Sequence, residues 1–289
     1  MKEKTVIITG ASSGIGKAAA VALAKMGAHI VMICRNPEKA TLARQQIMQQ
    51  SNNQQVDLFI CDLSVQQQIR QLSLKLLQTY PRMDVLLNNA GLMTSKRTIT
   101  QDGLETTFAT NHVAYFLLTN LLLPNITATP NARIVNVASG IHPMIREVDF
   151  DNLQAEKSFR PFTAYALSKL GNILFTYELA RRLAAAGSST TVNCMHPGFV
   201  GSNFGQNDTG SLWMHWGMKL LKPFIRTPEK GAETAVYLAS SDEVTGVSGK
   251  YFVDCKAISS SPLTYDTALA GRFWQTTEKL ALLTAEAPQ

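Results

Sequence analysis

The 289-residue sequence predicts an α/β fold, in which a doubly wound parallel sheet carries helices on both faces. Short apolar runs of the kind buried in parallel sheets recur along the chain, beginning with residues 5–9. Helical segments separate these runs, and a glycine-rich turn joins the first run to the first helix. Such alternation is typical of a parallel sheet with right-handed crossovers. We expect one domain over residues 1–289, because neither a linker nor an internal repeat interrupts the pattern.

The expected strands and helices alternate from the first element to the last. Strands are predicted at residues 5–9, 28–34, 55–61, 84–87, 133–137, 190–195 and 250–253. Helices are predicted at about 17–26, 37–50, 65–79, 102–123, 161–186 and 228–240. Gly27 ends the first helix and Pro37 opens the second, which are positions that these residue types favour.

Two stretches depart from this alternation. Residues 141–160 form a long insertion of mixed polarity, and residues 202–227 are rich in Trp, Met and Phe. Both follow strands, at the carboxyl edge of the sheet where open α/β sheets bind ligands. We interpret residues 202–227 as an apolar lid over a substrate; the alternative is a segment that lies on a membrane surface.

Composition excludes several classes of protein. The net charge is +6, but the basic residues are scattered, which indicates a solvated surface rather than nucleic-acid binding. None of the four cysteines forms a CxxC pair, so no metal site is expected. We find no signal peptide and no apolar run of the ~18 residues that span a bilayer. We therefore expect a cytoplasmic protein without a transmembrane segment.

Residues 9–16 form the glycine-rich turn between the first strand and the first helix. Gly10, Gly14 and Gly16 allow a sharp bend and a close approach of the backbone to a bound pyrophosphate, whose charge the helix N-terminus favours. Ser12, Ser13 and Ile15 lie within the same turn. This context predicts a dinucleotide site, although the Gly-x-x-x-Gly-x-Gly spacing differs from the Gly-x-Gly-x-x-Gly fingerprint.

The end of the second strand indicates which dinucleotide is bound. An acidic residue there would bind the 2′-hydroxyl of NAD, whereas this sequence has Arg35. A guanidinium matches a phosphate in bidentate geometry, so we predict NADP(H). The alternative is an ordinary surface arginine.

Polar and small residues also end the third and fourth strands. Asp62, followed by Leu63, is placed to accept a hydrogen bond from an adenine amino group, or to cap the next helix. Asn89 and Ala90 lie in a small turn that would border the cofactor ribose.

Tyr165 and Lys169 lie four residues apart in a predicted helix, and therefore on one face. An ammonium near a phenol favours the phenolate and lowers the phenol pKa. Such a tyrosine exchanges a proton with a carbonyl or alcohol oxygen near neutral pH. Ser139, after the fifth strand, would bind the same oxygen, and Asn111 sits inside a helix where asparagine is unfavourable. Taken singly, Ser139 and Asn111 could equally be caps or exposed polar residues.

Together these residues resemble the short-chain dehydrogenase/reductase family across almost the whole chain. The matching motifs, in order, are Thr9-Gly10-x-x-x-Gly14-x-Gly16, Asp62, Asn88-Asn89-Ala90-Gly91, Asn111, Ser139, Tyr165-x-x-x-Lys169 and Pro197-Gly198. The resemblance implies a Rossmann-like domain with a seven-stranded sheet, and hydride transfer between nicotinamide and a carbon that bears oxygen. It further implies a homodimer or homotetramer.

The resemblance also implies a role for each catalytic residue. Tyr165 is the acid/base, and Lys169 lowers its pKa and holds the nicotinamide ribose. Ser139 orients the substrate oxygen, and Asn111 supports a proton relay through water. Val200 and Ser202 would touch the nicotinamide carboxamide, although the family often has Thr where Ser202 stands.

The sequence is most similar to the retinol dehydrogenase-like branch of this family. The similarity rests on Leu104-Glu105-x-Thr107-Phe108-x-x-Asn111-His112, on the long spacing from Ser139 to Tyr165, and on Ser248-Gly249-Lys250-Tyr251-Phe252-x-Asp254-Cys255. The branch implies a bulky apolar alcohol or carbonyl as substrate, and an apolar lid suits such a substrate. Two alternatives remain, a non-catalytic NADP(H) sensor and an epimerase or C=C reductase on the same scaffold.

Overall fold

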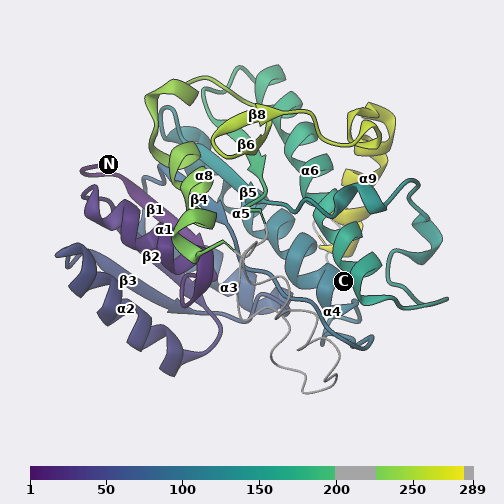
Figure 1. Ribbon diagram of the computed structural model, residues 1–289, viewed down its shortest axis with the longest axis horizontal. Coiled ribbons are helices and arrows are strands. Elements are labelled where there is room, and N and C mark those ends of the chain that lie inside the picture. Colours follow the sequence, from purple (N-terminus) through teal and green to yellow (C-terminus); the bar gives the residue numbers. More distant parts are fainter. Residues whose placement is uncertain (199–225, 283–289) are drawn as a thin grey trace.

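The computed structural model describes residues 1–198 and 226–282. Its strands form one eight-stranded sheet in the order β3-β2-β1-β4-β5-β6-β7-β8 (Figure 1). The strands are β1 (Thr5–Thr9), β2 (His29–Cys34), β3 (Val56–Ile60), β4 (Val85–Asn88), β5 (Arg133–Val137), β6 (Thr191–Met195), β7 (Tyr251–Val253) and β8 (Lys256–Ile258). Strands β1 to β7 pair in parallel, which confirms the predicted fold class.

The eighth strand was not expected. β8 runs antiparallel to β7, and the two residues between them, Asp254 and Cys255, have φ angles of 48° and 60°. Two consecutive residues with positive φ are typical of the tight turns that join hairpin strands. The three residues of β8 are exposed, so their sequence lacks the apolar run that predicts a buried strand.

The long helices cover both faces of the sheet (Figure 1). One face carries α1 (Gly14–Lys25), α2 (Pro37–Ser51) and α8 (Pro228–Ser240), which share one apolar core with the strands. The other face carries α3 (Gln66–Thr79), α5 (Ala114–Ala128), α6 (Pro161–Ala185) and α9 (Thr267–Leu280), around a second core. No helix in the described ranges is long and apolar enough to cross a bilayer.

The helix predicted at 102–123 is three elements in the structure. α4 (Thr106–Phe108) is followed by a π-helical turn, η1 (Ala109–Val113), which leads into α5. Glu105 sets the start, because its carboxylate accepts hydrogen bonds from the backbone N–H groups of Thr107 (2.8 Å) and Phe108 (2.7 Å). Single π turns inside helices often occur at functional sites, and this one contains Asn111.

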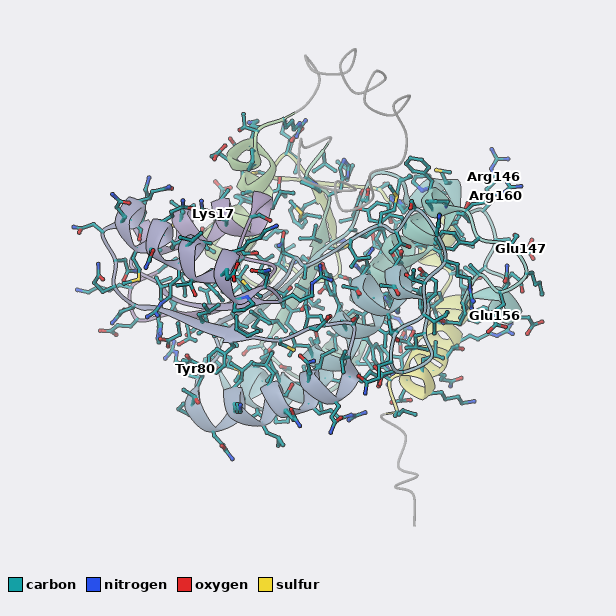
Figure 2. The ribbon with its side chains drawn as sticks, turned by 90° about the horizontal axis from the view of Figure 1, so that it is seen from below. Lys17, Tyr80, Arg146, Glu147, Glu156 and Arg160 are labelled. Atoms are coloured by element: carbon teal, nitrogen blue, oxygen red, sulfur yellow. The ribbon has the colours of Figure 1, made fainter. Side chains whose placement is uncertain are left out.

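Two further segments shape the end of the molecule that carries α6. α9, which the sequence analysis did not predict, buries Ala270, Phe273, Trp274 and Thr277, spaced as one face of a helix. The 141–160 insertion contains two short 3-10 turns, η2 (His142–Met144) and η3 (Phe150–Asn152). Figure 2 shows four charged side chains of the insertion at one end of the molecule, far from Lys17 and Tyr80; they are Arg146, Glu147, Glu156 and Arg160.

Candidate active site

The glycine-rich turn lies against the end of β4. Gly10 and Gly14 have φ angles of 70° and 53°, in the left-handed region that favours glycine. A Cβ on Gly16 would lie 2.4 Å from the side-chain nitrogen of Asn89 and 2.5 Å from the carbonyl oxygen of Gly10. No side chain larger than hydrogen fits there without moving the turn.

The start of α1 is suited to bind an anion. The helix begins at Gly14, and the side chain of Ser13, its N-cap residue, donates and accepts no capping hydrogen bond within the described residues. The first backbone N–H groups of a helix lack intrahelical partners, so here they stay available to a phosphate. Ser12 contacts the buried thiol of Cys34, which fixes this turn against the end of β2. The turn therefore fits the pyrophosphate that the sequence predicts.

Arg35 directly follows β2 and is exposed. Asn36 caps α2 by accepting a hydrogen bond from the Lys39 backbone N–H (2.8 Å), which directs the chain away from the sheet. In the part of the chain that the structure describes, the Arg35 guanidinium has no carboxylate partner and remains available to a ligand.

Asp62 does not cap the next helix. Its Oδ1 accepts hydrogen bonds from the backbone N–H and the hydroxyl of Ser64, at 2.9 and 2.7 Å. α3 is instead capped from a distance, because Asp102 accepts from the backbone N–H of Gln66 at 2.8 Å. The neighbouring Leu63 is buried. The adenine-binding role of Asp62 therefore stays a prediction.

Asn89 and Ala90 connect the ends of β4 and β1. Their backbone N–H groups donate to the Thr9 hydroxyl at 2.8 and 3.0 Å, and the Asn89 amide donates to the Thr9 carbonyl at 2.8 Å. These bonds hold the β4 turn beside the glycine-rich turn. Both turns lie between β1 and β4, where the strand order reverses and ligands bind in such sheets.

Tyr165, Lys169 and Ser139 meet at the carboxyl edge of β5. The Ser139 hydroxyl hydrogen-bonds the Tyr165 phenol. Lys169 Nζ lies 5.7 Å from the centre of the Tyr165 ring and donates to the Val137 carbonyl at 2.9 Å. A Cβ on Gly91 would lie 3.5 Å from Lys169 Nζ, so the turn after β4 packs close to the lysine.

Burial dominates the ionisation of both groups. It lowers the pKa of Lys169 to about 7 and raises the pKa of Tyr165 to about 12, the latter despite the opposing bond from Ser139. The expected lowering of the Tyr165 pKa by Lys169 is therefore wrong for this structure. The physical reason is that removal of a phenolate from water outweighs the hydrogen bond from Ser139, and Lys169 is not among the groups that shift the Tyr165 pKa.

Asn111 is fully buried, and its side chain is bound to neighbouring groups. Its amide accepts from the Leu92 backbone N–H and donates to the Leu92 carbonyl, each at 2.8 Å, and it donates to the Ser168 hydroxyl at 3.1 Å. The side chain thus fixes the segment after β4 to α6. The relay role of Asn111 therefore stays a prediction.

Sequence reasoning missed two polar residues at this site. Tyr115 donates to the Ala90 carbonyl at 2.7 Å and lies 5.5 Å, from ring centre to Nζ, from Lys169. Asn172, three residues after Lys169, contacts the carbonyls of Asn111 and Val137. Asn172 could have been found, because it is an asparagine inside a helix on the face of Lys169, the same signal that singled out Asn111.

The histidines, the expected absence of a metal site and the 202–227 segment complete the comparison with the sequence. His112, His142 and His196 each hydrogen-bond protein groups. No group of His, Cys, Asp or Glu in the described ranges could hold a metal ion. Val200, Ser202 and nearly all of the expected 202–227 lid lie outside the described residues. Arg226 pairs with Asp254, and Thr227 caps α8.

Comparison with known proteins decides the family. The sequence model of short chain dehydrogenases matches residues 4–211, a range that includes the glycine-rich turn, Ser139, Tyr165 and Lys169. The chain belongs to the short-chain dehydrogenase/reductase family. Its relatives include human retinol dehydrogenase 14, which is 40% identical over 96% of this chain and 86% of its own length. Human retinol dehydrogenase 13 is 39% identical over 99% of this chain and 86% of its own length. The chain is thus placed in the retinol dehydrogenase-like branch.

Solved structures share the fold of this chain. An uncharacterized protein from Mycobacterium paratuberculosis is similar at a TM-score of 0.79 and 30% identity, covering 97% of this chain and 94% of that one. A short chain dehydrogenase from Shigella flexneri, complexed with NADP, shares the fold at a TM-score of 0.66 and 24% identity, covering 87% of this chain and 97% of that one.

Proposed function

We propose that this protein is an NADP(H)-dependent oxidoreductase that interconverts an alcohol and a carbonyl. Its working direction is reduction of a bulky apolar aldehyde or ketone, with Tyr165 as the acid/base. The observation that carries the proposal is the hydrogen bond between Ser139 and Tyr165 beside a buried Lys169, at the same sheet edge as the glycine-rich turn. The Shigella neighbour, whose structure contains NADP, supports the choice of cofactor.

The residues divide the chemistry between them. The glycine-rich turn and Arg35 would hold NADPH. When bound, NADPH would supply a hydride to the carbonyl carbon of the substrate. The raised pKa of Tyr165 keeps the phenol protonated at neutral pH, so Tyr165 is a proton donor for the carbonyl oxygen. Ser139 holds that oxygen, and after proton transfer its hydroxyl and Lys169 stabilise the phenolate. Reduction suits a site whose tyrosine rests in the acid form.

Two observations favour an apolar substrate. Phe162 precedes Tyr165 by three residues, on the same face of α6, and is 53% exposed. Met144, in the turn that follows Ser139, is 56% exposed. Exposed apolar side chains beside a polar catalytic pair suit a ligand with an apolar body and one oxygen. Two of the relatives above carry the name retinol dehydrogenase, which makes retinal the first compound to test.

The test follows NADPH oxidation with retinal, a ketosteroid, a long-chain aldehyde and an aryl ketone. We expect turnover with NADPH in preference to NADH. Tyr165→Phe should lower kcat by a factor of about 10² to 10⁴, the usual contribution of a general acid. Tyr177→Phe, on the same helix but bonded to Ser260, is the matched control and should retain turnover.

Two outcomes would replace the proposal. Tight NADPH binding by fluorescence without turnover of any compound would favour a sensor, or an epimerase or C=C reductase. Absence of NADPH binding would exclude the dinucleotide site itself.

A further inference from the structure

A line of buried polar side chains connects the C-terminal helix to the catalytic lysine. Thr277 of α9, His112 of the π turn, and Asn172 and Lys169 of α6 are each at most 2% exposed. Thr277 contacts His112, and His112 contacts Asn172; Asn172 and Lys169 then meet at a shared acceptor, the Val137 carbonyl oxygen. Buried polar groups need partners with matched donors and acceptors, so the direction of each bond can be worked out.

The direction follows from the two carbonyls at the lysine end. Asn172 Nδ2 donates to the Asn111 carbonyl at 3.0 Å and to the Val137 carbonyl at 3.3 Å. Its Oδ1 must therefore accept, and it lies 3.1 Å from His112 Nδ1, which carries the proton. Burial lowers the pKa of His112 to about 4, so the ring is neutral and its Nε2 is an acceptor 3.0 Å from the Thr277 hydroxyl, whose single proton is shared with the Phe273 carbonyl at 2.8 Å.

The line of polar side chains ends at the Val137 carbonyl oxygen, which also binds the Lys169 ammonium. Val137 O accepts from both Asn172 Nδ2 and Lys169 Nζ, at 3.3 and 2.9 Å. Gly171 makes room for this arrangement, because a Cβ there would lie 2.9 Å from both His112 Nδ1 and Phe273 Cε1. Glycine is unfavourable inside a helix, so its presence at 171 fits a need for close approach.

We propose that Asn172 is a positioning residue for Lys169 and for the Asn111 carbonyl, and that Thr277 supports it through His112. The inference rests on the proposed function for its kinetic consequence, but its structural consequence does not depend on turnover. Loss of the Asn172 amide frees two carbonyls and lets water reach Lys169. Loss of the Thr277 hydroxyl leaves the imidazole without a donor and loosens Asn172.

The first experiment compares Thr277→Val with Thr276→Val in the full chain. Both substitutions remove a hydroxyl that also bonds a carbonyl four residues earlier in α9, but only Thr277 touches His112. We expect Thr277→Val to lower kcat about two- to tenfold, the range for one buried hydrogen bond, with KM for NADPH little changed. Thr276→Val should leave kcat unchanged. Equal kcat in the two variants would overturn the support role of Thr277.

The second experiment reads Lys169 directly, without turnover. Protein with ¹³Cε-labelled lysine is titrated by NMR, with the Lys169 signal assigned from Lys169→Arg. The ionisable side chains that face Lys169 in the described ranges are Tyr165, Tyr115 and His112, all neutral at pH 7 given their shifted pKa values. In the wild type we expect a midpoint near the lowered pKa of about 7.

Asn172→Ala should move that midpoint upward, because water stabilises the ammonium. Asn136→Ala removes another buried amide, one that bonds Asn88 and Thr176, and should leave the midpoint unchanged. An unchanged midpoint in Asn172→Ala would overturn the proposal for Asn172. If the wild type turns over no compound, the proposed function fails while this titration still decides the positioning role. If Asn172→Ala does not fold, the midpoint in Thr277→Val decides it.

Discussion

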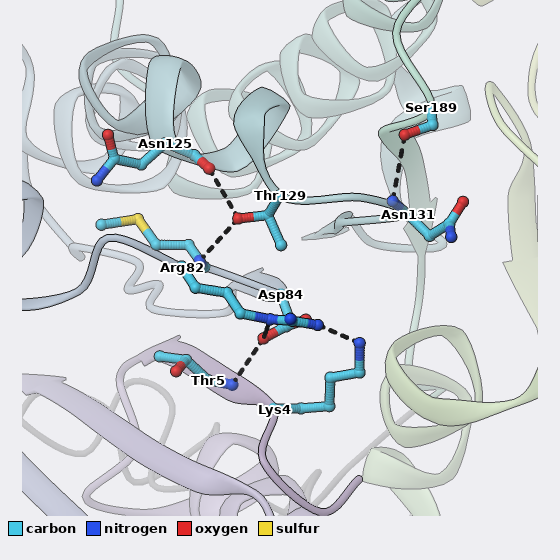
Figure 3. A network of polar contacts seen from close by, with 9 residues as sticks. Lys4, Thr5, Arg82, Asp84, Asn125, Thr129, Asn131 and Ser189 are labelled. Atoms are coloured by element: carbon cyan, nitrogen blue, oxygen red, sulfur yellow. Dashed lines mark hydrogen bonds and ion pairs between the residues drawn. The ribbon is translucent and has the colours of Figure 1, made fainter.

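A charged side chain is buried at each of the two edges of the sheet, in different surroundings. At the amino edge Asp84, 4% exposed, accepts from Lys4 (2.9 Å), from Arg82 (2.8 Å) and from the Thr5 backbone N–H (3.0 Å) (Figure 3). At the carboxyl edge Lys169, 2% exposed, donates to one carbonyl and faces two aromatic rings. No carboxylate in the described ranges pairs with it.

The paired charge, Asp84, contributes to stability, whereas the unpaired charge, Lys169, lies at the candidate active site. Around Asp84, further bonds join the loops that precede β4 and β5: Thr129 accepts from the Met83 backbone N–H (3.1 Å) and donates to the Asn125 carbonyl (2.8 Å) (Figure 3). A buried charge with a full set of partners holds the structure, whereas a buried charge without a counter-ion is retained at a cost in stability. Incomplete pairing of this kind is common at functional sites.

Removal of the paired charge should have the largest effect on stability. Asp84→Ala leaves the Thr5 N–H unsatisfied and separates two cations from their carboxylate, so we expect the free energy of unfolding to fall by about 2–4 kcal/mol. Urea denaturation measures it. Asp57→Ala is the control, because Asp57 is 45% exposed and its pair with His29 should contribute about 1 kcal/mol or less. Equal losses in the two variants would contradict the assigned role of Asp84.

Removal of the unpaired charge of Lys169 should raise stability, whereas removal of Asp84 should lower it. Lys169→Met keeps the apolar stem and removes a desolvated amine, so we expect the free energy of unfolding to rise by about 1–3 kcal/mol while turnover is lost. Lys75→Met, at an exposed position of α3, should change stability by about 0.5 kcal/mol or less. A Lys169→Met variant less stable than the wild type would show that the lysine has a stabilising partner.

Sequence reasoning performed unequally at the two edges. The glycine-rich turn, Tyr165 and Lys169 were predicted because their signals are local: a spacing of a few residues fixes a turn or one face of a helix. Asp84 attracted no notice, because its partners Lys4 and Arg82 are recognisable only once β1 and β4 are paired. The cap of α3 illustrates the same limit. Asp62, which is near in sequence, does not cap this helix, and the capping carboxylate comes from Asp102, far along the chain.

The sign of the Tyr165 pKa shift shows a second limit. The spacing of Tyr165 and Lys169 predicts their proximity, but the depth at which the pair is buried depends on segments that pack over it. The contact of Thr277 with His112 likewise joins residues 165 positions apart, which no local pattern reveals. Burial and long-range contacts are properties of the fold and not of the motif.

Arg35 at the carboxyl edge and Arg82 at the amino edge provide a comparison with a smaller expected effect. Arg35→Ser should weaken NADPH binding about ten- to hundredfold relative to NADH, because a charge-assisted bond to the 2′-phosphate is worth about 1.5–3 kcal/mol. Stability should stay unchanged, since Arg35 has no partner in the described structure. Arg82→Ser should do the reverse, with lower stability and unaltered coenzyme preference. Isothermal titration of both coenzymes gives the ratio, and an unchanged ratio in Arg35→Ser would exclude Arg35 as the NADP determinant.

The two charges should also differ in pH dependence, because they act at opposite ends of the pH range. Asp84 has a lowered pKa in the folded state, so its contribution is present above pH ~4 and is lost as the pH falls through the folded value. The stability difference between wild type and Asp84→Ala should therefore shrink in acid. Other carboxylates titrate in both proteins, so the difference isolates Asp84.

Lys169 should affect stability between pH 7 and pH ~10. As for Asp84, stability should rise with pH in this range. Its folded pKa of about 7 lies below the value near 10.5 of an exposed lysine, so in this window the unfolded chain holds a proton that the folded chain has released. Raising the pH then favours the folded state, by at most about 1.4 kcal/mol per pH unit for one proton. The advantage of Lys169→Met should accordingly shrink as the pH rises. A constant difference from pH 7 to pH 10, measured by urea denaturation, would mean that Lys169 titrates in the folded protein as an exposed lysine does.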